Sequence, residues 1–108
     1  MKISNEQKDS CVLVSVEGRM DAVTAPEFES ACIELAEKGD IDLVVNLENL
    51  EYISSAGLRS VLTSAKKLKA LGGNLRFCGL SGMVEEVFRI SGFQSMFTIV
   101  PTFDDIAK

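Results

Sequence analysis

The sequence predicts a single α/β domain in which helices pack on a central sheet. Apolar residues alternate along the chain between the period of a strand and the period of a helix, so that short strands and helices follow one another throughout. The length of 108 residues, of which 46% are hydrophobic and 25% charged, suits one compact domain over residues 1–108. Such alternation is typical of parallel strands joined by right-handed helical crossovers.

The predicted N-terminal elements are a β-hairpin and a helix. In residues 11–18 one face carries three valines (Val12, Val14 and Val16), as in a half-buried strand, and residues 1–4 can pair beside it. The segment that follows has apolar residues at helical spacing: Phe28, Ala31, Cys32, Leu35 and Ala36. Thr24 can cap this amphipathic helix, Pro26 suits its first turn and Gly39 ends it.

The central elements are a buried strand and the longest helix of the chain. Residues 42–47, DLVVNL, form a short run rich in branched apolar side chains, which suits a strand covered on both faces inside the sheet. The helix is predicted to begin within two residues of Ser55 and to end at Gly72-Gly73. Its apolar stripe consists of Leu58, Val61, Leu62, Ala65 and Leu68.

The C-terminal third continues the alternation. Residues 74–79 (NLRFCG) predict a strand, residues 82–91 (GMVEEVFRIS) a helix, residues 96–100 (MFTIV) a last strand and residues 102–108 (TFDDIAK) a short terminal helix. Five large apolar side chains of this region form either part of the core or an exposed patch for a partner. They are Met83, Phe88, Phe93, Met96 and Phe97.

The charge of the chain favours a protein partner over nucleic acid or a membrane. The formal net charge is −5, whereas phosphate backbones and anionic lipids select a basic surface. No apolar run reaches the ~20 residues needed to cross a bilayer, and residues 1–14 lack the pattern of a signal peptide. We therefore expect a cytoplasmic protein that binds another protein and makes no direct contact with nucleic acid or membrane.

The cysteines and glycines do not predict a metal or nucleotide site. Cys11, Cys32 and Cys78 are widely spaced, no C-x-x-C motif occurs, and the chain has no histidine to complete a metal site. We interpret the three cysteines as small buried hydrophobic residues. Neither a G-x-G-x-x-G motif nor a P-loop lysine is present. The sequence therefore predicts neither a metal nor a cofactor.

Two adjacent hydroxyls stand where we expect the buried strand to lead directly into the longest helix. Open α/β sheets often carry functional residues at this position, but serine is also among the best N-caps, so capping alone would explain Ser54 or Ser55. Nucleophilic catalysis is disfavoured because Ile53 replaces the first glycine of a G-x-S-x-G motif, in which only Gly57 fits. Without histidine, neither a Ser-His-Asp nor a Cys-His arrangement is possible, so we expect no enzyme.

The stretch DLVVNLENLEYISSAGLRSVL, residues 42–62, resembles the strand, signature loop and helix of anti-sigma factor antagonists of the STAS domain family. The resemblance covers essentially the whole chain. VEGRMDAVTAPEFE (16–29) resembles the family's G-x-x-D and Thr-Ala segment, ALGGNLRFCGLSGMVEEVF (70–88) its later helix and strand, and RISGFQSMFTIVPTFDDIAK (89–108) its closing region. This resemblance implies a STAS-like single domain with a central mixed sheet of about five strands.

The same resemblance implies a regulator that switches partners. An unphosphorylated antagonist of this family binds an anti-sigma factor that is also a serine kinase, and phosphorylation of one serine releases it. That serine precedes a small residue and then Gly-Leu, which places it at Ser55, and Asp21 matches the Asp of the G-x-x-D segment at the same edge of the sheet. The implied partner-binding residues are Asp21, Thr24, Ser54, Ser55, Ala56, Gly57, Leu58 and Arg59.

The sequence departs from the family at the residue before the phosphorylated serine. Many members have Asp at that position, whereas this chain has Ser54. Ser54 is therefore either an alternative phosphorylation site or a plain N-cap. The alternative function for the chain is a docking subunit of a larger sensory or scaffold assembly, in which the loop is never phosphorylated.

Overall fold

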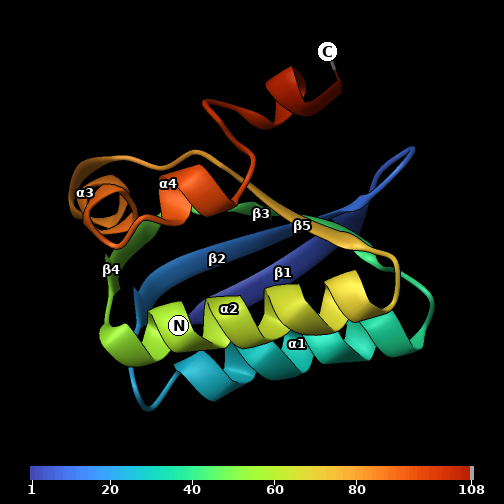
Figure 1. The fold of residues 1–108 in the computed structure, drawn as a ribbon, viewed down its shortest axis with the longest axis horizontal. Helices are drawn as coiled ribbons and strands as arrows, with labels where there is room; N and C mark the ends of the chain where they lie inside the picture. The colour runs from blue at the N-terminus through green and yellow to red at the C-terminus, as the bar shows by residue number, and fades with distance from the viewer. Residues whose placement is uncertain (108) are drawn as a thin grey trace.

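Helices pack on a mixed sheet in this chain (Figure 1). The structure is a computed structural model that describes residues 1–107. The path of the sheet is β1-β2-β3-β5-β6, with β4 paired to β2 beyond the end of β3. β1 is antiparallel to β2, and the other pairs are parallel, which confirms the predicted α/β class and the N-terminal hairpin. The strands are β1 (Lys2–Gln7), β2 (Val12–Met20), β3 (Asp42–Asn46), β4 (Leu50–Ile53), β5 (Asn74–Cys78) and β6 (Ile99–Val100).

The two longest helices lie side by side across one face of the sheet. Their N-terminal ends lie at the same end of the molecule as β4 and the third helix (Figure 1). A short 3₁₀ helix near the C-terminus lies on the opposite side of the sheet. The helices are α1 (Ala25–Glu37), α2 (Ser55–Ala70), α3 (Gly82–Ile90), α4 (Phe93–Met96) and the 3₁₀ helix η1 (Phe103–Ala107).

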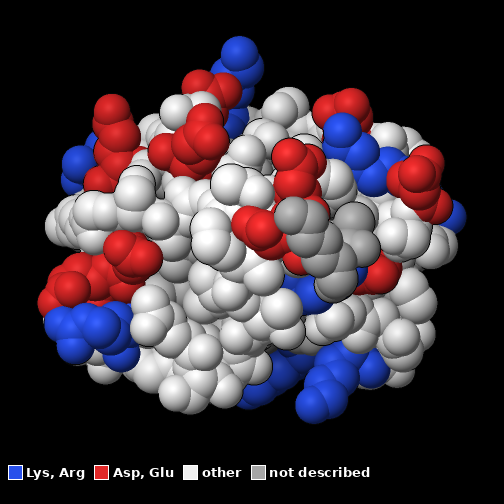
Figure 2. Space-filling view, turned by 90° about the horizontal axis from the view of Figure 1, so that it is seen from above, with Lys and Arg blue, Asp and Glu red and all other residues white. Residues whose placement is uncertain are grey.

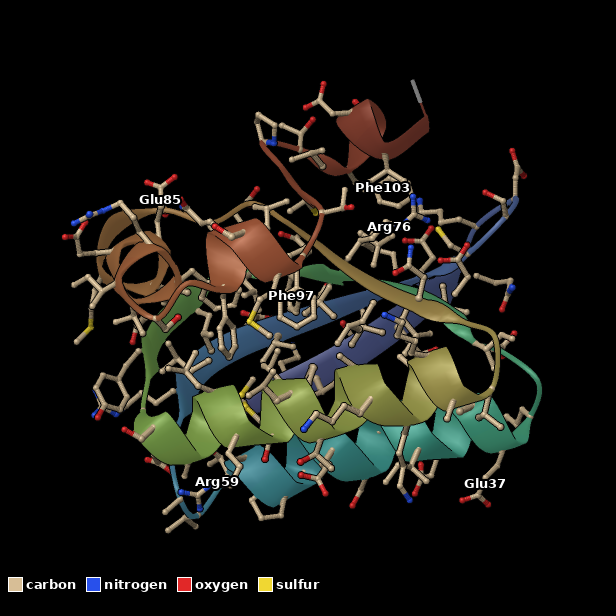
Figure 3. All side chains as sticks on the ribbon, in the orientation of Figure 1. Glu37, Arg59, Arg76, Glu85, Phe97 and Phe103 are labelled. Carbon is tan, nitrogen blue, oxygen red and sulfur yellow. The ribbon has the colours of Figure 1, made fainter. Side chains whose placement is uncertain are left out.

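β3 lies inside the sheet, as predicted, because its side chains are covered on both faces. Leu43 and Val45 pack into the main core with α1 and α2, while Val44 faces a second apolar cluster. Phe103 and Ile106 of η1 pack against this second cluster, and Figure 3 shows Phe103 directed from η1 toward the sheet. All three β3 side chains are fully buried, which explains the continuous apolar run in the sequence.

The structure corrects three predictions about the elements. The strand at 42–47 does not lead directly into the serines, because a turn and the short strand β4 (Leu50–Ile53) stand between them. The last strand contains only Ile99–Val100, because Phe93–Met96 forms the short helix α4. The predicted terminal helix is a 3₁₀ helix over Phe103–Ala107, and Lys108 lies outside the described residues.

The C-terminal apolar residues divide between the core and the surface. Phe88 and Phe93 are buried, and Phe97 is partly buried and packs against the main core. Met83 and Met96 are about half exposed, at 51% and 56%. The interpretation as core therefore holds for the three aromatic residues and not for the two methionines.

The cysteines are buried, free thiols, as the sequence predicted. Within residues 1–107, no group of acidic, cysteine or histidine side chains is arranged to hold a metal ion. None of the helices in that range has both the length and the hydrophobicity needed to span a membrane. Acidic and basic side chains are interspersed over the face that Figure 2 shows.

Candidate functional site

The ends of two parallel strands bring the candidate residues together. β2 and β4 end at paired residues, so Asp21 and Ser54, which follow them, leave the sheet side by side. The Ser54 amide donates a hydrogen bond of 2.9 Å to the Met20 carbonyl oxygen, which fixes the start of α2 against the end of β2. Residues 21–24 and 54–59 thereby form one surface, which we call the Ser55 surface.

Ser54 is the N-cap of α2. Its backbone is extended, with φ −95° and ψ 177°, and its hydroxyl accepts a hydrogen bond of 3.2 Å from the Gly57 amide. Its carbonyl oxygen accepts the Leu58 amide over 2.9 Å. The Ser54 hydroxyl thus satisfies one of the amides that a helix start leaves without intrahelical partners, and the Ser54 carbonyl oxygen accepts the first intrahelical bond.

Ser55 is the first residue of α2, as predicted, and its side chain is exposed. Within the described residues its hydroxyl has no hydrogen-bond partner, in contrast to the capping hydroxyl of Ser54. The amides of Ser55 and Ala56 are not used by the cap, so they remain available at the positive end of the helix dipole. The two serines therefore differ in role, with Ser54 structural and Ser55 accessible.

Asp21 organises the loop beside Ser55. Its Oδ1 accepts hydrogen bonds from the amides of Val23 at 3.0 Å and Thr24 at 3.1 Å. The Thr24 amide is the main cause of a lowered Asp21 pKa, and the Val23 amide, the Thr24 hydroxyl and the charge of Arg19 act in the same direction. The carboxylate is therefore ionised at neutral pH, and its hydrogen bonds define the shape of the loop.

Thr24 does not cap α1 through its side chain, contrary to the prediction from the sequence. Its backbone is already helical, with φ −93° and ψ −24°, whereas a capping residue needs an extended conformation. Its hydroxyl instead lies 2.7 Å from the Arg19 carbonyl oxygen and accepts the Asp21 amide over 2.9 Å. Thr24 therefore ties the loop to the end of β2.

Gly57 and Leu58 are the inner residues of the Ser55 surface, since Gly57 is buried and Leu58 is partly buried. A Cβ at Gly57 would stand 2.7 Å from Cγ1 of Ile53 and 2.9 Å from the carbonyl oxygen of Met20. Leu58 is partly buried against the main core. The glycine therefore allows α2 to approach the ends of β2 and β4 closely, and Ala56 and Arg59 on either side reach the surface.

Replacing Gly57 with alanine is expected to lower the free energy of unfolding by about 1–3 kcal/mol, because the backbone of Met20 would have to move. Alanine stabilises an open helical position relative to glycine by about 1 kcal/mol. Urea unfolding of the variant therefore tests whether α2 approaches the ends of β2 and β4 this closely, because the two effects change the free energy of unfolding in opposite directions. A Gly57→Ala variant more stable than the wild type would contradict it.

Three surface residues beside the site were not singled out by the sequence. The Arg19 guanidinium lies 4.2 Å from the centre of the Tyr52 ring, across the β2–β4 pair. Val23 is 84% exposed at the tip of the Asp21 loop. The sequence signal for Tyr52 is the short strand-forming stretch 50–53, which is missing from the predicted strands, and Arg19 pairs with Tyr52 across the two strands.

Together, the fold and the Ser55 surface define a small α/β domain that presents one exposed serine at a helix N-terminus. The chain belongs to the STAS domain family, whose model matches residues 2–107. It is 38% identical over 99 residues to BtrV of Bordetella bronchiseptica, provisionally named an anti-sigma factor antagonist, covering 92% of this chain and 85% of BtrV. It is 30% identical over 96 residues to the anti-sigma-B factor antagonist of Staphylococcus aureus, covering 89% of each.

A solved structure shows the same fold. The Bacillus cell fate determinant SpoIIAA, in its phosphorylated form, superposes with a TM-score of 0.74. The match covers 98% of this chain and 97% of SpoIIAA at 19% identity. The predicted STAS-like architecture is thus confirmed, with a sheet of six strands because β4 is added.

Proposed function

We propose that the chain is an anti-sigma factor antagonist that binds an anti-sigma factor with serine kinase activity and is released when that kinase phosphorylates Ser55. The names of the two relatives support the antagonist role. The observation that carries the choice of serine is that the Ser55 side chain is exposed whereas the Ser54 hydroxyl is hydrogen-bonded to the Gly57 amide. A kinase can reach the Ser55 hydroxyl without disturbing the start of α2.

Phosphorylation of Ser54 would carry a structural cost that phosphorylation of Ser55 avoids. The Ser54 oxygen accepts the Gly57 amide at 3.2 Å, and the residue is partly buried. A phosphate on that oxygen would have to replace the cap and fit between α2 and the end of β2. Ser55 extends from the first turn of the helix and meets neither constraint.

The partner in this proposal contacts the Ser55 surface through Asp21, Thr24, Ala56 and Arg59 as well as the serine. Asp21 supplies an ionised carboxylate, and Arg59 is exposed at the N-terminal end of α2 (Figure 3). Ser54, Gly57 and Leu58 contribute chiefly by holding this surface in place. The surface thus offers both signs of charge around a neutral hydroxyl, which suits a charged protein partner.

The chain would be the substrate of the kinase and not an enzyme. It contains no histidine that could take a proton from the serine, so the base would come from the kinase. The proposed antagonist works in the cytoplasm through protein contacts, without binding nucleic acid or membrane itself. It needs no metal or cofactor in this role.

The test is phosphorylation of the chain by the kinase recovered with it from its own cells, followed by peptide mapping. We expect phosphate on the wild type and on Ser54→Ala, and none on Ser55→Ala. Ser54→Ala should lose about 1 kcal/mol of stability with its cap, which separates its structural role from modification. Phosphate only on Ser54 would refute the assignment, and recovery of a sensory scaffold without any modification would favour a docking subunit instead.

A further inference from the structure

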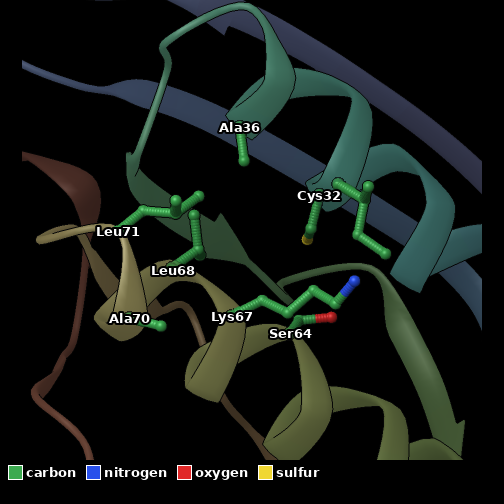
Figure 4. A pocket seen from close by; sticks show the side chains of 8 residues that line it. Cys32, Ala36, Ser64, Lys67, Leu68, Ala70 and Leu71 are labelled. Atoms are coloured by element: carbon green, nitrogen blue, oxygen red, sulfur yellow. The ribbon is translucent and has the colours of Figure 1, made fainter.

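A pocket lies between the C-terminal halves of α1 and α2, away from the Ser55 surface at their N-terminal ends. Its volume is about 310 Å³, near the lower end of the roughly 300–1,000 Å³ typical of small-molecule sites. Figure 4 shows Cys32 and Ala36 on α1, and the remaining labelled side chains on α2 or, for Leu71, just after its end. Its wall is almost wholly apolar and consists of Cys32, Ile33, Ala36, Ser64, Lys67, Leu68, Ala70 and Leu71.

One polar group in this wall has no proper partner. Ser64 is 1% exposed, and its Oγ finds no hydrogen-bond partner among the described residues. The Cys32 thiol lines the same pocket, and its pKa is raised to about 12 by burial and partly lowered by the Ser64 hydroxyl. Sulfur is a weak acceptor, so the contact satisfies the hydroxyl poorly. A buried hydroxyl without a good partner is unfavourable, and a ligand oxygen would satisfy it.

Lys67 adds a positive charge at the rim of the same pocket. It is exposed and stands three residues after Ser64 on α2, so the two side chains leave neighbouring points of one helix face. An ammonium group and a hydroxyl donor so close together suit one carboxylate. Beyond them, Leu68, Leu71 and Ala36 line the rest of the pocket with apolar surface (Figure 4).

We propose that the pocket between α1 and α2 binds a free medium-chain fatty acid. The carboxylate accepts a hydrogen bond from the Ser64 hydroxyl and pairs with the Lys67 ammonium group. The alkyl chain lies against Leu68, Leu71 and Ala36, where each buried methylene group adds to the affinity. The Ser64 oxygen is sealed from solvent, so entry of the carboxylate requires the side chains around it to part.

The first experiment titrates the chain of residues 1–108 with octanoate and follows the backbone amides by NMR. We expect saturable shifts centred on α1 and α2 around Cys32 and Ser64, and weaker binding of octanol, which lacks the charge. Vesicles of phosphatidylglycerol, tested in parallel, should not compete. Absence of saturable octanoate binding at millimolar concentration, shifts centred elsewhere, or binding to vesicles alone would overturn the proposal.

Three variants locate the ligand. Ser64→Ala should weaken octanoate binding about ten-fold or more without lowering the melting temperature, because it removes an unsatisfied hydroxyl. Lys67→Gln should weaken binding by up to about five-fold, whereas the matched control Lys66→Gln, on the same helix but outside this pocket, should not. Ala36→Leu should fill the pocket and abolish binding. Equal binding by Ala36→Leu and the wild type would refute the site.

Discussion

Phosphorylation of Ser55 is expected to lower the affinity of the chain for its anti-sigma partner by about 100-fold or more. A partner surface formed around a neutral hydroxyl would have to bury or repel a group that carries about −1.5 to −2 charges at neutral pH. Desolvating an unmatched charge at an interface costs several kcal/mol, which exceeds the ~2.7 kcal/mol that corresponds to this loss. Calorimetric titration of the partner with modified and unmodified chain measures the effect.

The domain itself should change in stability by no more than about 1 kcal/mol on phosphorylation. The free amides of Ser55 and Ala56 can donate hydrogen bonds to the phosphate at the positive end of the helix dipole. Arg59, which is exposed one turn along α2, adds a positive charge on the same side of the helix. We expect these contributions to offset the repulsion from the Asp21 carboxylate, so the proposed switch would act on the interface and not on folding.

Two substitutions at Ser55 test whether a negative charge there lowers the affinity for the partner without lowering the stability of the domain. Ser55→Ala should melt near the wild type and keep the partner, while Ser55→Asp, with a single charge, should lose part of the affinity and also stay folded. Ser10→Asp provides the matched control, because Ser10 is exposed in the β1–β2 turn at the other end of β2. Equal losses in the two aspartate variants, or unchanged affinity after Ser55 phosphorylation, would contradict the switch.

The fold was predictable where side-chain periodicity is set by burial. The run Leu43, Val44 and Val45 marked a central strand because it is covered by α1 and α2 on one face and by η1 on the other. The sequence did not predict β4, because this strand has only four residues and pairs with β2 alone, beyond the end of β3. The sequence did not predict α4 either, because four residues cannot display a helical period. The burial of Phe93 in the core decides the conformation of this segment.

The site was predictable in its location and less so in its local roles. The resemblance placed Asp21 and the serines at one edge of the sheet, and in the structure they follow Met20 and Ile53, which pair at the ends of β2 and β4. Which serine caps the helix depends on backbone angles, because Ser54 is extended and Ser55 is helical, and side-chain types alone do not specify this. The same reason explains Thr24, whose helical backbone prevents the capping that its residue type suggested.

Replacing Phe77 with alanine is expected to cost about 3–5 kcal/mol, the usual range for removing a fully buried phenylalanine. Phe77 is 0% exposed, and its ring meets Phe88 edge-on at 5.3 Å and Phe97 at 5.2 Å between centroids. Figure 3 shows Phe97 pointing into the interior from the end of α4. Through these rings Phe77 connects β5 with α3 and α4, and α3 in turn lies beside β4, which leads into Ser54.

Chemical denaturation of Phe77→Ala measures this loss of stability. The loss should be a large part of the ~5–15 kcal/mol free energy of unfolding that is typical of a single domain. Phe103→Ala is the matched control, because Phe103 is only partly buried and packs in the separate cluster on the other face of the sheet. It should lose less than half as much, since less apolar surface is exposed to water. Equal destabilisation of the two variants would show that the aromatic cluster around Phe77 does not hold α3 and α4 to the sheet as the ring contacts indicate.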